Sequence, residues 1–224
     1  MEKIDKWSRY AVLFLAIFHL IGITGLHLDI KPEILNGQSV KELFQSLVPL
    51  NLLLTISIVL LFHKPWNQRT AIYLFVVFWI GYLVELIGVR TGAIFGDYVY
   101  GEALGIKVAG IPPMIGVNWV LLIYLTGCIA QGFSANLWVG AAIGSSLMIA
   151  LDLLIEPMAI RYDFWTWSGG EIPLLNFFGW FVISYLLHLG FYYVESKPDN
   201  PIAKSVYVIQ LLFFGMFWVI SMAS

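Results

Sequence analysis

The chain has little charge. Asp, Glu, Lys and Arg make up only 12% of its 224 residues, 60% of the residues are hydrophobic, and the mean hydropathy is +0.85. Because about a quarter of the residues in a soluble domain are charged, this composition excludes a soluble protein and predicts an integral membrane protein. The net charge is −2 and the sequence has no basic run, so we expect no nucleic acid as a partner.

Motifs that carry cofactor chemistry are also missing. Cysteine occurs once, at Cys128, which excludes a disulfide within the chain. The four histidines are scattered, so an iron-dependent membrane hydroxylase would lack its ligands. No Gly-x-Gly-x-x-Gly motif supports a flavin or nicotinamide fold. Closely spaced aspartates for magnesium and diphosphate are absent, as is a lysine inside the last hydrophobic run for retinal. We therefore expect no cofactor and no metal.

What the sequence has instead is long hydrophobic runs. A helix needs about twenty apolar residues to cross about 30 Å of hydrocarbon. The runs predict an all-α, polytopic membrane helix bundle of about seven transmembrane helices, forming one integral-membrane domain over residues 1–224. No small-x-small cleavage signal follows the first run, so we interpret it as a span and not a signal peptide. The predicted spans are 9–28, 43–62, 71–90, 113–132, 134–156, 174–194 and 203–222.

The distribution of Lys and Arg indicates the orientation. On this count of spans, seven of the twelve lie on the same side as the N-terminus and five on the opposite side. The positive-inside rule then favours a cytoplasmic N-terminus in a multi-pass protein of the cell membrane. Ten of the fourteen acidic residues lie on the side opposite the N-terminus.

Two segments, 81–119 and 152–180, echo one another. Each begins with an apolar helix that ends in a glutamate with an arginine five residues later, as in Glu85–Arg90 and Glu156–Arg161. An aspartate followed by aromatic residues comes next, and then a proline seven residues before a tryptophan. The aspartates are Asp97 and Asp163; the Pro–Trp pairs are Pro112–Trp119 and Pro173–Trp180. Chance similarity between two helix-to-loop junctions is the alternative explanation.

The third and fifth predicted spans run in the same direction, so both end at the same face of the membrane. This parity gathers seven ionisable residues at one mouth of the bundle: Glu85, Arg90, Asp97, Asp152, Glu156, Arg161 and Asp163. Asp152 and Glu156 are four residues apart and share a helix face, and Pro157 predicts that the helix ends near Glu156. Charges beside a hydrophobic span are costly to keep, so they indicate a functional site.

Carboxylic acids and aromatic rings suit one kind of chemistry. A carboxylic acid kept neutral by burial and by a neighbouring carboxylate can deliver a proton, and aromatic faces stabilise a cation, by about 2 kcal/mol or more each when water is excluded. Together they suit protonation of an isoprenoid double bond. The candidate aromatic residues are Tyr98, Tyr100, Tyr162, Phe164, Trp165 and Trp167. An aromatic belt at the membrane surface would explain the same rings without a site.

Four further residues have simpler interpretations. For Arg90 and Arg161 we favour ion pairs with Glu85 and Glu156 that close the bundle. His19 and His188 lie in the middle of spans, where we expect hydrogen bonds across helices and not ligand or base roles.

The motifs VELIGVRTGAIFGDYVYG, IPPMIGVNW and LDLLIEPMAIRYDFWTW resemble those of the CruF-type carotenoid biosynthesis family of membrane hydratases. The resemblance covers roughly the third to sixth spans. It implies addition of water, without a cofactor, to the terminal double bond of an acyclic carotenoid, as in bisanhydrobacterioruberin or γ-carotene-type ψ-ends. The product would be a tertiary alcohol. The acidic motif positions fall on Glu85, Asp97, Asp152, Glu156 and Asp163.

The resemblance and the residues together give a mechanistic hypothesis. Asp152 or Glu156 protonates the alkene, and Glu85 or Asp97 holds the water that captures the cation. Arg90 and Arg161 orient the carboxylates, and Asn118 and Trp119 join the aromatic residues in binding the substrate. The polyene would lie along the apolar stripe of the third and fifth spans. The expected partners are a hydrophobic carotenoid, the lipid bilayer and other pathway enzymes.

Three rival functions remain open. A carotenoid cyclase or isomerase would use the same cation and lose a proton elsewhere. A small-molecule transporter would also carry acids inside the membrane, although its repeats are commonly inverted, whereas the two echoed segments here run in the same direction. A protein that only holds other pathway enzymes together is the third rival.

Overall fold

The computed structural model describes residues 5–195 and 198–223. Helices dominate the described chain, as the sequence predicts, and most of them begin close to the expected residues. They are α1 (Lys6–His27), the 3-10 helix η1 (Glu33–Leu35), α2 (Val40–Ser46), α3 (Val48–Leu61), α4 (Gln68–Thr91), α5 (Met114–Phe133), α6 (Leu137–Arg161), α7 (Leu174–Val194) and α8 (Ala203–Ala223).

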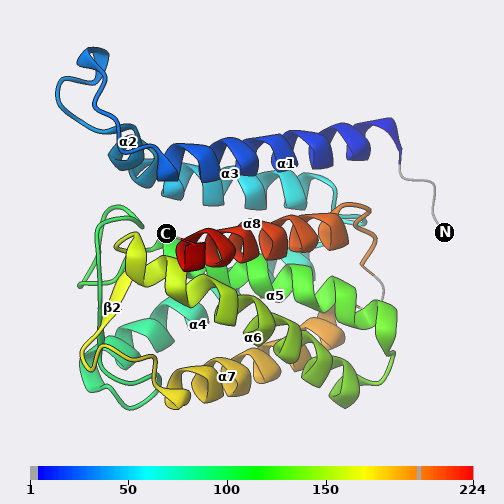
Figure 1. Cartoon of the computed structure of the whole chain (residues 1–224). Helices are drawn as coiled ribbons and strands as arrows, with labels where there is room; N and C mark the ends of the chain where they lie inside the picture. Colours follow the sequence, from blue (N-terminus) through cyan, green and yellow to red (C-terminus); the bar gives the residue numbers. More distant parts are fainter. Residues whose placement is uncertain (1–4, 196–197, 224) are drawn as a thin grey trace.

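The long helices run side by side and form one bundle (Figure 1). Helices α1 and α3 lie on one side of it, α4 and α7 lie on the opposite side, and α5, α6 and α8 lie between them. The central helix α5 is the most completely buried, and Trp119 and Tyr124 on it are fully enclosed. Polar and charged residues on α4 and α6 can therefore lie inside protein instead of facing lipid.

The second predicted span is broken. Residues 43–62 were expected to form one helix, but the chain bends by 47° between α2 and α3. Leu47 joins the two, and Pro49 lies in the first turn of α3, where proline is tolerated because its missing N–H has no intrahelical partner. Within the described residues, six helices are long and apolar enough to span a membrane, or seven if this bent pair counts as one.

A two-stranded antiparallel sheet closes one end of the bundle, and it was not anticipated from the sequence. Strand β1 (Tyr98–Tyr100) follows α4, and strand β2 (Trp165–Trp167) follows α6. The strands pair Tyr98 with Trp167 and Tyr100 with Trp165. Figure 1 shows β2 at the end of the bundle where α6 finishes. The two echoed segments of the sequence therefore meet directly.

Small residues allow α6 and α7 to approach closely, as expected for helix contacts in membranes. A Cβ added at Gly140 would collide with Tyr192, and one at Gly144 would collide with His188. His188 uses this proximity: it contacts the Thr126 hydroxyl at 2.8 Å and the Ser145 hydroxyl at 3.4 Å. The expected bonding across helices is confirmed for His188. His19 differs, because its hydrogen bond is to Leu15 of its own helix.

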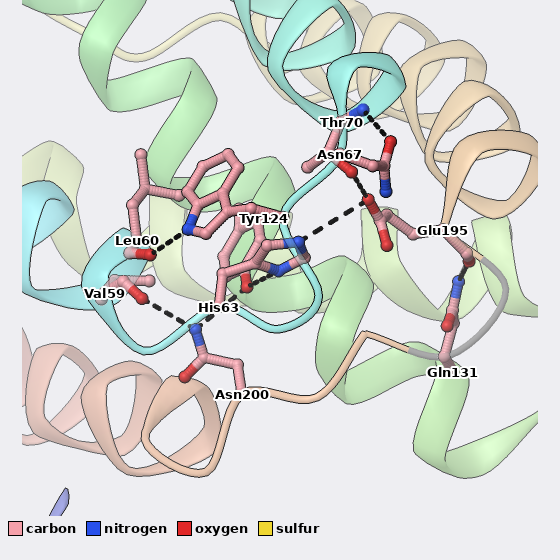
Figure 2. Close-up of polar contacts among 10 residues, drawn as sticks. Val59, Leu60, His63, Asn67, Thr70, Tyr124, Gln131, Glu195 and Asn200 are labelled. Carbon is pink, nitrogen blue, oxygen red and sulfur yellow. Dashed lines mark hydrogen bonds and ion pairs between the residues drawn. The ribbon is translucent and has the colours of Figure 1, made fainter.

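A buried polar network fastens the opposite end of the bundle (Figure 2). The His63 Nδ1 atom contacts the Tyr124 hydroxyl at 2.7 Å, and Asn200 donates to the same hydroxyl and to the carbonyl of Val59. Glu195 accepts a hydrogen bond from Thr70 and lies 3.9 Å from His63 Nε2. The network joins the α3–α4 connection to α5 and to the start of α8, which fixes the helices at the end away from the sheet.

Candidate functional site

Glu85 is buried at 2% exposure in the last two turns of α4. Its Oε2 atom accepts hydrogen bonds from the hydroxyls of Tyr98, at 2.5 Å, and Tyr100, at 2.7 Å. Its Oε1 atom accepts one from the indole N–H of Trp119 at 3.1 Å. Three donors satisfy the oxygens of this buried carboxylate, so Glu85 is built to be an acceptor.

Glu156 on α6 has an equivalent set of donors. Its Oε2 atom accepts hydrogen bonds from the indole N–H groups of Trp165, at 3.1 Å, and Trp167, at 2.9 Å. The Asn176 amide donates to its Oε1 atom at 3.0 Å. Each glutamate is thus held by the two inward-facing aromatic residues of the strand that follows its own helix. The pairing of β1 with β2 brings the two glutamates to one place.

Asp152 lies one helical turn before Glu156 and is 1% exposed. Its Oδ2 atom accepts a hydrogen bond from Asn176 at 3.3 Å, so one amide group contacts both carboxylates. Asn176 was not singled out from the sequence. The available signal was a polar amide in the first turn of the largely apolar predicted span 174–194.

A small space lies between the two glutamates. We call it the carboxylate chamber; it has a volume of about 10 Å³, which is close to the space that one water molecule needs. Its lining residues come from both echoed segments and are Glu85, Tyr98, Tyr100, Ile115, Glu156, Trp165, Trp167, Asn176 and Trp180.

A larger space of about 150 Å³, which we call the apolar cavity, adjoins the chamber. Ile115 and Trp165 line both spaces and therefore form the partition between them. The apolar cavity lies among α1, the α2–α3 bend, α5, α6 and α8, and aromatic rings such as Phe44, Phe164 and Phe213 make up much of its wall. A polar chamber beside an apolar cavity suits a hydrophobic molecule that reacts at one end.

Burial also fixes the protonation state of the two tyrosines beside Glu85, both of which lie outside the spans. Burial first, and then the nearby Glu85 carboxylate, raise the pKa of Tyr98 and of Tyr100 above the ordinary value of 10.0. Both hydroxyls therefore keep their protons at neutral pH and remain donors to Glu85.

Comparison with known proteins shows the family to which the chain belongs. The family model described as "Carotenoid biosynthesis protein" matches residues 47–224, which include every residue of the chamber. The chain belongs to this carotenoid biosynthesis family. It is also 27% identical over 126 residues to bisanhydrobacterioruberin hydratase of Haloarcula japonica; the alignment covers 51% of this chain and 42% of that protein. No solved structure matches the chain.

The site residues that the sequence predicted do not all gather in the chamber. Asp97 and Asp163 are exposed on the loops that flank the strands. The Asp163 side chain accepts a hydrogen bond from the backbone N–H of Glu102 at 2.8 Å, and the Asp97 backbone carbonyl accepts one from Ser168. These positions indicate that both aspartates shape the loops, and neither side chain lines the chamber.

The predicted arginine ion pairs are wrong. Arg90 and Arg161 are exposed, and in the described part of the chain neither forms an ion pair with Glu85 or Glu156. Each arginine is five residues beyond its glutamate, so on a helix it points well away from that glutamate's face. Aromatic hydroxyl and N–H groups take the place we had assigned to guanidinium groups.

The predicted end of α6 is also wrong. The helix continues through Pro157 to Arg161, so Glu156 lies more than a turn from its end. Pro157 removes only the bond to the Leu153 carbonyl, and the buried residues Met158 and Ala159 keep the last turn packed against the core.

The candidate aromatic residues fall into three groups. Tyr98, Tyr100, Trp165 and Trp167 are 4–7% exposed, which excludes a lipid-facing belt for these four. Phe164 lines the apolar cavity, as does the non-aromatic candidate Asn118. Tyr162 lies elsewhere: it packs against Phe217, with the Lys41 ammonium 5.4 Å from its ring centre.

Proposed function

We propose that this protein is an enzyme that adds water to the terminal C=C bond of an acyclic carotenoid and forms a tertiary alcohol without a cofactor. The observation that carries the proposal is the carboxylate chamber: two buried glutamates face a space close to the size of one water molecule, beside an apolar cavity. The likeness to a hydratase supports the same reaction, although it covers less than half of that relative.

The proton donor in this proposal is the Asp152–Glu156 pair. Two buried carboxylates one turn apart on a helix, joined by a single amide, are far easier to accommodate with one shared proton than as two anions. Glu156 lines the chamber and Asp152 does not, so Glu156 delivers the proton to the substrate. Asp152 shares this proton with Glu156 before the reaction, and the Asn176 amide orients both carboxylates. Asp152 is therefore a positioning residue.

Glu85 acts as the base. Its oxygens accept three hydrogen bonds, and no second carboxylate lies one turn away on its own helix, as Asp152 does for Glu156. A C–H bond forms between the proton of Glu156 and the less substituted alkene carbon, leaving a tertiary cation. The oxygen of the water in the chamber bonds to that cation while Glu85 takes the water's proton. Transfer of this proton across the chamber to the Asp152–Glu156 pair restores the starting state, so the net change is addition of one water.

Product mass tests the reaction. We expect cells that make lycopene, when they also produce this protein, to accumulate a pigment heavier by one water per reacted end. A new pigment of unchanged mass would show that the protein catalyses cyclisation or isomerisation through the same cation and not hydration. Unaltered pigments at normal protein levels would remove the catalytic proposal.

We also propose that the protein lies in the cell membrane with its N-terminus in the cytoplasm, as the Lys and Arg distribution favours. The exposed Asp97 would then face the outside and the exposed Trp66 the cytoplasm. In a Cys128→Ser background, we expect an impermeant maleimide to label Asp97→Cys but not Trp66→Cys in intact cells. The reverse pattern would invert the orientation.

A further inference from the structure

The apolar cavity lies away from the helices that the sequence favoured for the substrate. The polyene was expected along the third and fifth spans, which correspond to α4 and α6. In the described part of the chain, α4 contributes no residue to the wall of the cavity, and α6 contributes only Ile155 and Met158. Most of the wall comes from α1, the α2–α3 bend, α5 and α8.

The cavity continues to the lipid-facing side of the bundle. Helix α1 packs mainly against α2 and α8, and the apolar cavity occupies the space between α1 and α5. Ile21 on α1 and Leu47 at the α2–α3 bend line the cavity although these residues are 52% and 39% exposed. A hydrocarbon in the bilayer can therefore reach the cavity at this edge without crossing water.

The inner end of the cavity stops at the reacting groups. Trp165 and Ile115 separate it from the chamber, and the Trp165 indole is hydrogen-bonded to Glu156. The chamber, at about 10 Å³, is too small for a branched alkene. The cavity, at about 150 Å³, has the size of an engineered apolar cavity that binds benzene. It can hold the end of a chain while the remainder extends into lipid.

Resting on the proposed function, we propose that the apolar cavity binds the end segment of a linear polyene hydrocarbon, which enters from the bilayer between α1 and the α2–α3 bend. The terminal double bond lies at the partition of Ile115 and Trp165. Displacement of the Trp165 ring opens the partition towards Glu156. The class of ligand is a long, linear, methyl-branched conjugated chain with an uncyclised end, because the proposed reaction needs a terminal double bond that has not been used to close a ring.

Glycines on neighbouring helices provide a matched test. Gly22 lines the cavity, and a Cβ there would make only an ordinary contact, 3.7 Å from Phe213, so a larger residue fits on the backbone and projects into the space. Gly215 on α8 is not a lining residue, and a Cβ there would meet no atom of the described residues within 4 Å. We expect Gly22→Leu to weaken lycopene binding by about tenfold, a change that absorption titration resolves readily, and Gly215→Leu to leave it within about twofold.

A second pair of variants, at Ile21 and Leu20, keeps the test informative if the Gly22 variant does not fold. Ile21 and the adjacent Leu20 are about equally exposed on α1, at 52% and 51%, but only Ile21 lines the cavity. Ile21→Trp should weaken lycopene binding and raise KM, whereas Leu20→Trp should do neither. The binding measurement uses the purified protein in detergent and follows the shift of the polyene absorption bands.

The outcomes separate this inference from the proposed function. If the wild type hydrates lycopene but Gly22→Leu and Ile21→Trp bind and turn over like their controls, the cavity does not hold the polyene and the reaction stands. If the wild type binds lycopene in a manner sensitive to Gly22 and Ile21 but yields no hydrated product, the binding site stands and the reaction fails. Equal weakening by the control variants would also overturn the binding site.

Discussion

The indole rings of Trp119 and Trp180 stack with their centroids 4.3 Å apart and their planes inclined by 18°. Each tryptophan lies seven residues after a proline, Pro112 in one echoed segment and Pro173 in the other. Corresponding positions therefore touch at the centre of the bundle, just as β1 pairs with β2 at its end. Gly81 allows this packing, because a Cβ there would collide with the Trp119 ring.

The stacked tryptophans differ in one respect, which gives a matched prediction. Trp119 donates to Glu85, whereas Trp180 contributes its ring to the stack and to the chamber wall. Trp119→Phe and Trp180→Phe each reduce the stacked ring area by a similar amount. Only Trp119→Phe removes a hydrogen-bond donor from a carboxylate, an interaction worth about 1.5–3 kcal/mol. We expect a loss of turnover of tenfold or more for Trp119→Phe and a smaller one for Trp180→Phe. Similar turnover in both variants would show that the N–H bond to Glu85 is unimportant.

Asn176 is expected to act through Glu156 and Asp152. Asn176→Leu keeps the side-chain size but removes the donor to both carboxylates. We expect kcat to fall by about 10²-fold, at the lower end of the range for acid–base catalysis, with little change in KM and a shifted pH profile. Asn136→Leu is the control: it removes the N-cap of α6 at the far end, which should cost about 1 kcal/mol of stability but leave kcat and the pH profile unchanged. An unshifted profile for Asn176→Leu would reduce Asn176 to a packing role.

The tyrosines beside Glu85 limit the stability of the folded protein at alkaline pH. Burial raises the pKa of Tyr98 and of Tyr100 in the folded protein, so their contribution to stability is complete below the unfolded value of about 10 and is lost as pH rises through the folded value. Wild type and Tyr100→Phe should therefore show equal tyrosinate absorbance at about pH 10.5 while both remain folded. One tyrosinate fewer in Tyr100→Phe would mean that Tyr100 titrates as an exposed phenol.

The network at the opposite end should affect stability and not chemistry. Glu195→Ala leaves the Thr70 hydroxyl and His63 Nε2 without their acidic neighbour, and an unsatisfied buried polar group costs about 1–3 kcal/mol. Glu102→Ala removes only a surface pair with Lys107, worth at most about 1 kcal/mol. We expect a lower Tm in detergent for Glu195→Ala alone, with turnover per folded molecule unchanged. A large loss of turnover would connect this end to the reaction.

The sequence predicted the helical bundle because the length and hydropathy of the runs indicate membrane-spanning helices, although they did not predict the bend between α2 and α3. It also predicted that Glu85, Asp152 and Glu156 lie at one end, since helices that run in the same direction must end at the same face. It could not predict the partners of these carboxylates. The β1–β2 pairing depends on contacts between residues far apart in the chain, such as Tyr98 with Trp167. Asn176 carries no charge to draw attention, and the roles given to Arg90 and Arg161 assumed that carboxylates in membranes require cations.

The central claim is that Glu85 and Glu156 perform the reaction across the chamber they share. Its most direct test is the rate of hydrated pigment formation by Glu85→Gln and Glu156→Gln, together with Asp152→Asn, at matched levels of folded protein. Asp97→Asn and Asp163→Asn, which alter exposed carboxylates in the same motifs, are the controls. We predict a loss of at least about 10²-fold for both glutamate variants, a smaller loss for Asp152→Asn and near wild-type rates for the controls. Full hydration by Glu85→Gln and Glu156→Gln would contradict the account.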